Sequence, residues 1–178
     1  MSTARKQSRN ATFLGYRRPD GSVGVRNYVL LLPADKWVNM LTGQIAGWVV
    51  GTKQFVSPGE YGRPSADREL LARVLKGLGM NPNVAAVLVL GMAPEYGYPE
   101  CCATKLVEDI ARTGKPVEMV TVKQAGGTHR AIEQGVEVAR KLVRYASAIP
   151  REPFDAGHLT VGVKCGTSDP FSGIAGNP

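Results

Sequence analysis

Hydrophobic residues form five short runs along the chain, separated by segments with a different spacing. The runs cover residues 28–32, 54–56, 84–90, 117–122 and 159–163. Short, mainly apolar runs are typical of strands that are buried on both faces of a sheet. The run at 84–90 is the longest, so it predicts a central strand.

Between these runs, apolar residues recur at spacings of three and four, which places them on one face of a helix. The four predicted helices cover residues 37–48, 65–78, 100–112 and 132–143. Ser65 suits the N-cap of the second one. Strands and helices that alternate in this way predict an α/β fold: three layers, α/β/α, around a mostly parallel, doubly wound sheet of five strands.

The length of 178 residues fits one domain, and the net charge is +7. Most of the excess lies in residues 1–26, where six basic side chains face Asp20 alone. A polar, basic tail at 1–12 is therefore predicted, rather than a specific nucleic-acid interface. No apolar run is long enough to cross a membrane, and three cysteines without a CxxC spacing predict a reduced, cytoplasmic protein.

Candidate binding residues follow from the predicted sheet, because ligands of open parallel sheets bind beside the carboxyl ends of the strands. Five loops lie there: 33–36, 57–64, 91–96, 123–128 and 164–169. For each loop alone, turning the chain is the simplest role. Two of them nevertheless carry more chemistry than a turn needs.

The first of these loops joins a predicted strand to a predicted helix. Free N–H groups, the positive helix end and a lysine together suit a substrate carboxylate or phosphate. The residues concerned are Lys123, Gly126, Gly127 and Thr128. No nucleotide-binding motif is matched. The second loop combines a thiol, a hydroxyl and a carboxylate, on Cys165, Ser168 and Asp169.

The remaining candidates are weaker. Glu95 and Glu100 could form an acid–base pair across a loop, although solvated carboxylates are the commoner case. Cys101 and Cys102 open a predicted helix, where packing is favoured over reactivity because no histidine is near in sequence. The two histidines of the chain lie in different elements and are expected at the surface rather than on a metal.

Three segments resemble one family, and they occur in the family's order: residues 13–28, 81–91 and 165–178. They are similar to the middle domain of the altronate and galactarate dehydratases, followed by the first motif of the C-terminal domain. Sulfolactate sulfo-lyase large subunits are similar too. The resemblance implies a middle domain at 13–150, with a linker and the start of a truncated C-terminal domain at 151–178.

This family removes water or sulfite from the β-position of a hydroxy acid, after abstraction of the proton beside the carboxylate. The resemblance implies a sugar-acid dehydratase-like lyase with a small hydroxy acid as substrate. It also implies a separate small subunit as partner, and a divalent metal, commonly Fe²⁺, as the family's cofactor. The residues that it places at or near the catalytic site are Arg26, Asn27, Glu95, Cys165, Ser168 and Asp169.

The family's soft metal ligands are missing from the three loops that usually carry them. Trp37 stands in place of a Cys, and Ser57 and Tyr61 stand in place of a His and a Cys. Residues 93–95 are Ala-Pro-Glu instead of Gly-Cys-Glu. Thiolates and imidazoles hold such a metal, so we predict no metal ligands, no tight iron site and no activity of the chain alone. A non-catalytic relative that binds a small carboxylic acid or a partner subunit is the alternative.

The segment 159–178 leads into a further domain in the family. Here we expect it to complete the sheet as a fifth strand. A homodimer that exchanges this segment is the alternative, since an unpaired apolar strand favours association through its edge.

Overall fold

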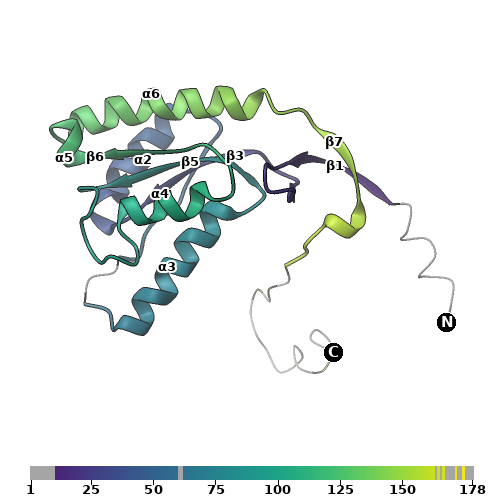
Figure 1. Ribbon diagram of the computed structural model, residues 1–178, viewed down its shortest axis with the longest axis horizontal. Coiled ribbons are helices and arrows are strands. Elements are labelled where there is room, and N and C mark those ends of the chain that lie inside the picture. Colours follow the sequence, from purple (N-terminus) through teal and green to yellow (C-terminus); the bar gives the residue numbers. More distant parts are fainter. Residues whose placement is uncertain are drawn as a thin grey trace.

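The computed structural model describes residues 11–59 and 62–162, and the single residues Lys164, Gly166, Phe171 and Ile174. The strands in this part of the chain are β1 (Thr12–Arg17), β2 (Val23–Gly24), β3 (Tyr28–Pro33), β4 (Thr52–Gln54), β5 (Val84–Gly91), β6 (Val117–Thr121) and β7 (Glu152–Asp155). The helices are η2 (Lys36–Val38), α2 (Asn39–Trp48), α3 (Ser65–Met80), α4 (Ala103–Ala111), α5 (Val122–Ala125), α6 (Thr128–Ser147) and η3 (Ala156–His158). They are arranged around two sheets (Figure 1).

The larger sheet is parallel and has the strand order β4-β3-β5-β6. β5 lies between β3 and β6, and all eight of its residues are buried. An uninterrupted apolar strand of this kind needs cover on both faces, which a parallel α/β sheet provides. The predicted α/β class and the central strand at 84–90 are confirmed.

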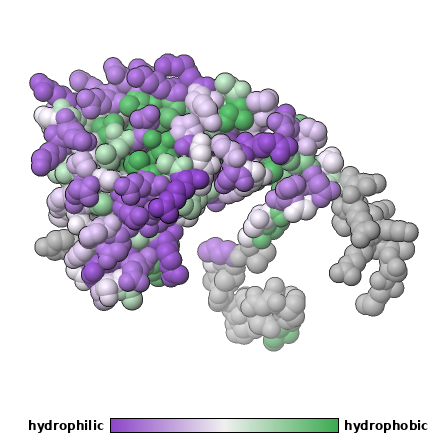
Figure 2. All heavy atoms as spheres, in the orientation of Figure 1, coloured by the Kyte–Doolittle hydropathy of each residue, from purple (hydrophilic) through white to green (hydrophobic). Residues whose placement is uncertain are grey.

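Helices cover both faces of this sheet, α2 and α6 on one and α3 and α4 on the other (Figure 1). Side chains of β3 contribute to the core on both faces of the sheet, because successive side chains of a strand point to opposite faces. Val29 and Leu31 belong to the core beneath α2 and α6, and Leu30 and Leu32 to the core beneath α3 and α4. Figure 2 shows hydrophobic side chains reaching the surface in a band below α6, amid largely hydrophilic surroundings.

Two glycines allow the helices to pack closely. A β-carbon on Gly135 of α6 would overlap the side chain of Ile45 in α2. A β-carbon on Gly79 of α3 would overlap Ile110 in α4. In each helix pair, a side chain in place of the glycine would therefore have to displace the isoleucine of the other helix.

The prediction that residues 159–163 form a fifth strand of the parallel sheet is wrong. The parallel sheet has four strands, and residues 159–162 form no strand and are exposed, with Val161 at 79%; Val163 lies outside the described residues. Apolar side chains at 159–163 alternate with Thr160 and Gly162, so the segment offers only one apolar face. The chain just before it is engaged elsewhere, in β7. Exchange of the segment between two copies stays a prediction.

A second sheet, antiparallel and ordered β2-β1-β7, joins the two ends of the described chain. The tight turn predicted at Asp20-Gly21 links β1 to β2. β7 was not predicted, because its four residues include Pro153, which strands tolerate only at edges. Phe154 of β7 is buried, packs on Phe13 at 6.1 Å and lies under the guanidinium of Arg17 at 4.8 Å.

Several element boundaries differ slightly from the sequence prediction. Pro64, not Ser65, is the N-cap of α3, and it makes no side-chain cap. β4 begins two residues earlier than expected, and the expected turn at 124–128 contains the short helix α5. None of the described helices is both long and apolar enough to span a membrane.

Candidate functional site

Four of the five candidate loops follow the parallel strands, so they meet at the carboxyl edge of the sheet. This edge is the one beside α5 in Figure 1. The helices after β3 and β5 leave toward opposite faces, α2 toward one and α4 toward the other. Adjacent strands whose connections diverge in this way create the crevice where α/β sheets bind ligands.

Asp35 links the loop after β3 to the loop after β5 through hydrogen bonds. One oxygen of its carboxylate accepts the N–H of Trp37 at 3.0 Å, and the other accepts the N–H of Met92 at 2.9 Å. The residue is only 2% exposed, and burial raises the pKa of its carboxyl group. Both oxygens are thus committed to the backbone, and Asp35 shapes the edge of the sheet rather than facing a ligand.

A hollow of about 320 Å³ opens beside this link. Its lining comes from the loops and helices that follow β3, β5 and β6: Trp37, Val38, Met40, Leu41, Met92, Tyr96, Val122 and Thr128. Most of these side chains are apolar. The volume lies at the lower end of the range for small-molecule sites.

The loop after β6, one of the candidate binding loops, contributes one side of this hollow. The N–H of Lys123 donates to the carbonyl of Met92 at 2.9 Å, which joins α5 to the loop after β5. Gly126 and Gly127 have φ angles of 81° and 131°, which turn the chain into α6. Thr128 begins α6 and lines the hollow, and the side chain of Lys123 is exposed.

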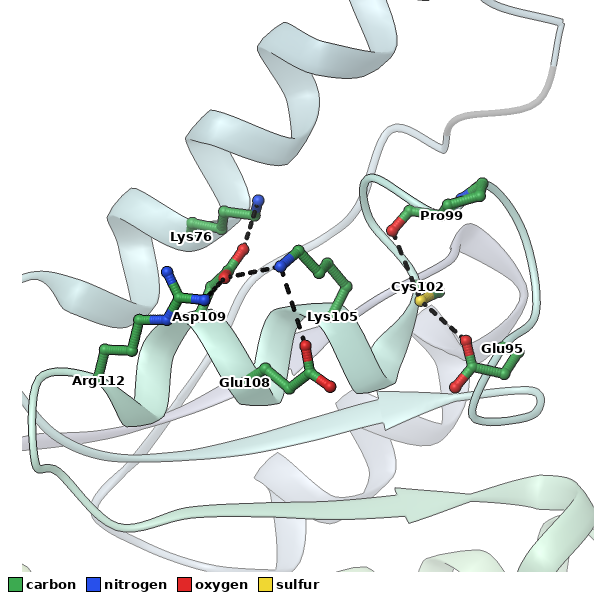
Figure 3. Close-up of polar contacts among 8 residues, drawn as sticks. All are labelled: Lys76, Glu95, Pro99, Cys102, Lys105, Glu108, Asp109 and Arg112. Atoms are coloured by element: carbon green, nitrogen blue, oxygen red, sulfur yellow. Dashed lines mark hydrogen bonds and ion pairs between the residues drawn. The ribbon is translucent and has the colours of Figure 1, made fainter.

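Glu95 lies in the loop after β5, against a cysteine (Figure 3). The Cys102 thiol donates to the Glu95 carboxylate, with Sγ and Oε2 3.6 Å apart, and also lies 3.7 Å from the carbonyl of Pro99. Burial, and secondarily the Glu95 charge, raise the pKa of the thiol. Cys102 therefore stays a thiol at neutral pH and acts as a hydrogen-bond donor, not as a nucleophile. Cys101 is buried in the core, as expected for a packing residue.

Glu100 does not pair with Glu95. Its carboxylate faces Arg68 at 3.9 Å. The guanidinium of Arg68 also stacks 4.0 Å over the ring of Tyr98. Glu95 is exposed and keeps only the contact with Cys102 among the bonds of the described residues.

Figure 3 also shows a charged cluster between α3 and α4. Asp109 is 6% exposed and is surrounded by Lys76 at 2.5 Å, Lys105 at 3.0 Å and Arg112 at 3.5 Å. The hydrogen bond from Lys76 is the main reason that the pKa of Asp109 is lowered. This cluster ties two helices together and has no access to the hollow at the carboxyl edge.

The side chains at the carboxyl edge do not fit a transition metal. Trp37 and residues 93–95 follow β3 and β5, and Ser57 follows β4, where its N–H and C=O are bound by Asn39. The described residues hold no group of three or more His, Cys, Asp or Glu side chains that could bind a metal ion. Both histidines of the chain, His129 and His158, are exposed, as predicted.

Arg26 and Asn27 lie at the opposite, amino edge of the sheet. They precede β3, whose six residues separate them from the carboxyl edge by roughly 20 Å. Asn27 accepts from the guanidinium of Arg18 at 2.8 Å and donates to the carbonyl of Ala146 at 2.5 Å. The side chain of Arg26 is exposed. The structure therefore does not bring these two residues together with Glu95, Lys123 or Thr128.

Two buried cationic side chains, those of Arg18 and Lys115, stabilise this amino edge through hydrogen bonds to backbone carbonyls. Arg18 is 2% exposed and also donates to the carbonyls of Pro82, at 2.6 Å, and Arg26, at 2.8 Å. Lys115 is 4% exposed, and its ammonium donates to the carbonyls of residues 79, 80 and 81 at the end of α3. Burial lowers the pKa of Lys115 to about 8.

A second hollow, of about 390 Å³, lies at the amino edge. It is lined by Ser22, Val23 and Val25 in and beside β2, by residues 81–83 and by residues 158–160. The chain that leads toward Cys165, Ser168 and Asp169 thus starts near Arg26. These three candidate residues lie outside the described residues.

Of the residues that form the hollow, the sequence pattern marks Thr128 as a binding candidate and Trp37 as the replacement of a cysteine. Asp35, Met92 and Tyr96 stand in the sequence only as members of candidate loops. The available indication was an aspartate directly after an apolar strand, at the edge where ligands bind. The apolar lining residues carry no recognisable motif.

Comparison with known proteins places this fold in a family. Residues 15–147 match the second domain of D-galactarate dehydratase/altronate hydrolase. The chain belongs to this dehydratase family. The family assignment made from sequence segments is thereby confirmed.

Named relatives agree with this assignment. The (2R)-sulfolactate sulfo-lyase subunit beta of Chromohalobacter salexigens is 44% identical over 169 residues, which are 94% of this chain and 41% of that protein. Altronate dehydratase of Escherichia coli is 32% identical over 92% of this chain and 34% of its own length. Galactarate dehydratase (L-threo-forming) of Escherichia coli is 28% identical over 94% of this chain and 35% of its own length. The chain spans less than half the length of these relatives, and no solved structure matches it.

Proposed function

We propose that this chain is the hydroxy-acid-binding α/β domain of a dehydratase-like lyase, and that it does not eliminate water by itself. One observation carries the proposal. In a chain whose residues 15–147 match the family's second domain, the loops after β3, β5 and β6 meet around one hollow at the carboxyl edge.

The loop after β6 binds the substrate carboxylate. Helix α6 has 20 residues, and Gly127 at its N-cap provides no side-chain cap, so the first N–H groups of the helix are available to an anion. Lys123 belongs to α5, the short helix before α6, and its exposed side chain adds a positive charge near the start of α6. Thr128 offers a hydroxyl group inside the hollow.

Glu95 is exposed and directly precedes Tyr96, which lines the hollow, and in this proposal it removes the proton beside that carboxylate. The electron pair of the C–H bond forms a carbon–carbon double bond, the bond from the β-carbon to its oxygen breaks, and the leaving hydroxide takes up the proton that Glu95 removed and departs as water. The hydrogen bond from Cys102 orients Glu95 for this step. The leaving hydroxyl also needs activation, and the described carboxyl edge has no side-chain group suited to hold a metal for it. This step therefore belongs to a part of the lyase beyond the described residues.

A partner subunit is part of this proposal, because one relative is named as subunit beta. Several points stay predictions: the domain division at residue 150, the homodimer, the cytoplasmic location, and the catalytic roles of Arg26, Asn27, Cys165, Ser168 and Asp169. A non-catalytic acid-binding relative remains the alternative, and it shares the binding step.

Binding and turnover test the two halves of the proposal separately. Glycerate, a hydroxy acid with a β-hydroxyl group, is titrated by NMR to high millimolar concentration. Lys123→Ala is expected to weaken binding about tenfold, because a charge-assisted contact is lost. Lys141→Ala removes an exposed lysine in the second half of α6, away from the hollow, and serves as the matched control.

Equal affinities of the two variants, or no binding by the folded chain, would overturn the binding site. Turnover of glycerate is followed by NMR as formation of the 2-oxo acid to which the enol product tautomerises, with and without added Fe²⁺. Turnover by the chain alone that a chelator abolishes would overturn the claim that the chain is inactive by itself.

A further inference from the structure

The walls of the hollow are more apolar than the elimination chemistry requires. Trp37, Met40 and Leu41 come from η2 and α2, and Met92 and Val122 follow β5 and β6. Among the lining side chains, only Tyr96 and Thr128 carry hydroxyl groups. A volume of about 320 Å³ exceeds what a three-carbon acid fills and leaves room for a substituent of ring size.

This lining discriminates between classes of hydroxy acid. A six-carbon sugar acid has hydroxyl groups along its whole chain, and those that face the buried walls at Val38 and Leu41 would lose water without gaining a partner. Each hydroxyl buried and unpaired there weakens binding by about tenfold. An aromatic or branched alkyl group instead gains contact with the indole of Trp37 and the flexible thioethers of Met40 and Met92.

The charges around the hollow suit the same class of ligand. The exposed Lys123 and Arg130 flank the start of α6, with the guanidinium of Arg130 lying close to Gly126. A carboxylate therefore finds positive charge at the margin, beside apolar walls that take the remainder of the molecule. We propose that the acid bound here carries an aryl or branched alkyl substituent, in place of the hydroxylated chain of a sugar acid. This inference rests on the proposed function and names the substrate class of that site.

Fluorescence of Trp37 measures binding without any need for turnover. The chain has two tryptophans, and Trp48→Phe leaves Trp37 as the only reporter. The probes are glycerate, galactarate and 3-phenyllactate, which carries the aryl group but has no β-hydroxyl group and so reports binding without turnover. We expect 3-phenyllactate to bind at least about tenfold more tightly than galactarate.

Two exposed apolar residues provide a matched pair of variants. Met40 lines the hollow and is 69% exposed, whereas Val50 is 93% exposed and does not line it. Met40→Gln is expected to weaken 3-phenyllactate binding about fivefold, and Val50→Gln to leave it within about twofold. Both substitutions lie at the surface and keep the fold.

Three results would overturn the inference. If galactarate binds as tightly as 3-phenyllactate, or if the two variants behave alike, the substrate class is wrong and the proposed function stands. If none of the three acids binds to the folded chain, the proposed function fails as well.

Discussion

Removing the Asp35 carboxylate should destabilise the domain and loosen the hollow at the carboxyl edge. Asp35→Ala leaves the N–H groups of Trp37 and Met92 without their acceptor, at a site that is 2% exposed. Each buried, unsatisfied N–H group costs about 1–3 kcal/mol. Relief of the buried charge, which is what raises the pKa of Asp35, acts in the opposite direction. We therefore expect a loss of about 2 kcal/mol in the free energy of unfolding.

Urea unfolding at pH 7, followed by tryptophan fluorescence, measures this loss. Asp155→Ala is the matched control, because the Asp155 carboxylate is exposed and accepts one backbone N–H, from Gly157 at 2.7 Å. The control should change the free energy of unfolding by no more than about 0.5 kcal/mol. If the two variants unfold at the same urea concentration, the link between the loops does not stabilise the domain and the reasoning is refuted.

Two further predictions concern the amino edge and the helix packing. The pKa of Lys115 is about 8 in the folded chain against 10.5 as the ordinary value, so the unfolded chain holds more protons between these values and the free energy of unfolding should rise with pH there. Lys115→Met should lack this rise in urea titrations from pH 7.5 to 10.5, and an identical slope in both proteins would contradict the burial of Lys115. Gly135→Val should lower the free energy of unfolding by about 1–3 kcal/mol, because the new side chain collides with Ile45. Gly47→Val, where nothing lies nearby, is its control, and equal melting temperatures would refute the close packing.

The parallel sheet could be predicted because its strands are continuous apolar runs. The run at 84–90 has no polar residue, and such a strand has no stable place except between neighbours and under helices on both faces. The segment 159–163 also has strand character, but its apolar residues alternate. Strand propensity alone does not fix pairing, which depends on where the preceding chain is held. Here the pairing of β7 with β1 decides that position.

The candidate site was predicted only in part, for a related reason. The loop at Lys123 to Thr128 could be found because strand, glycines and helix follow one another in the sequence. Asp35 and Met92 are separated by 57 positions, and their contact arises from tertiary packing alone. The family resemblance grouped Arg26 with residues of the carboxyl edge. It could not show that a whole strand length lies between them.

The central claim is that the hydroxy acid binds at the carboxyl edge of the sheet. Amide chemical-shift mapping of the whole chain during titration with 3-phenyllactate tests it most directly. The account predicts shifts concentrated on Met92, Val122 and Thr128, with residues 22–27 unmoved. Shifts concentrated at Arg26, Asn27 and residues 158–160, with the carboxyl edge unmoved, would place the acid in the hollow at the amino edge and contradict the account.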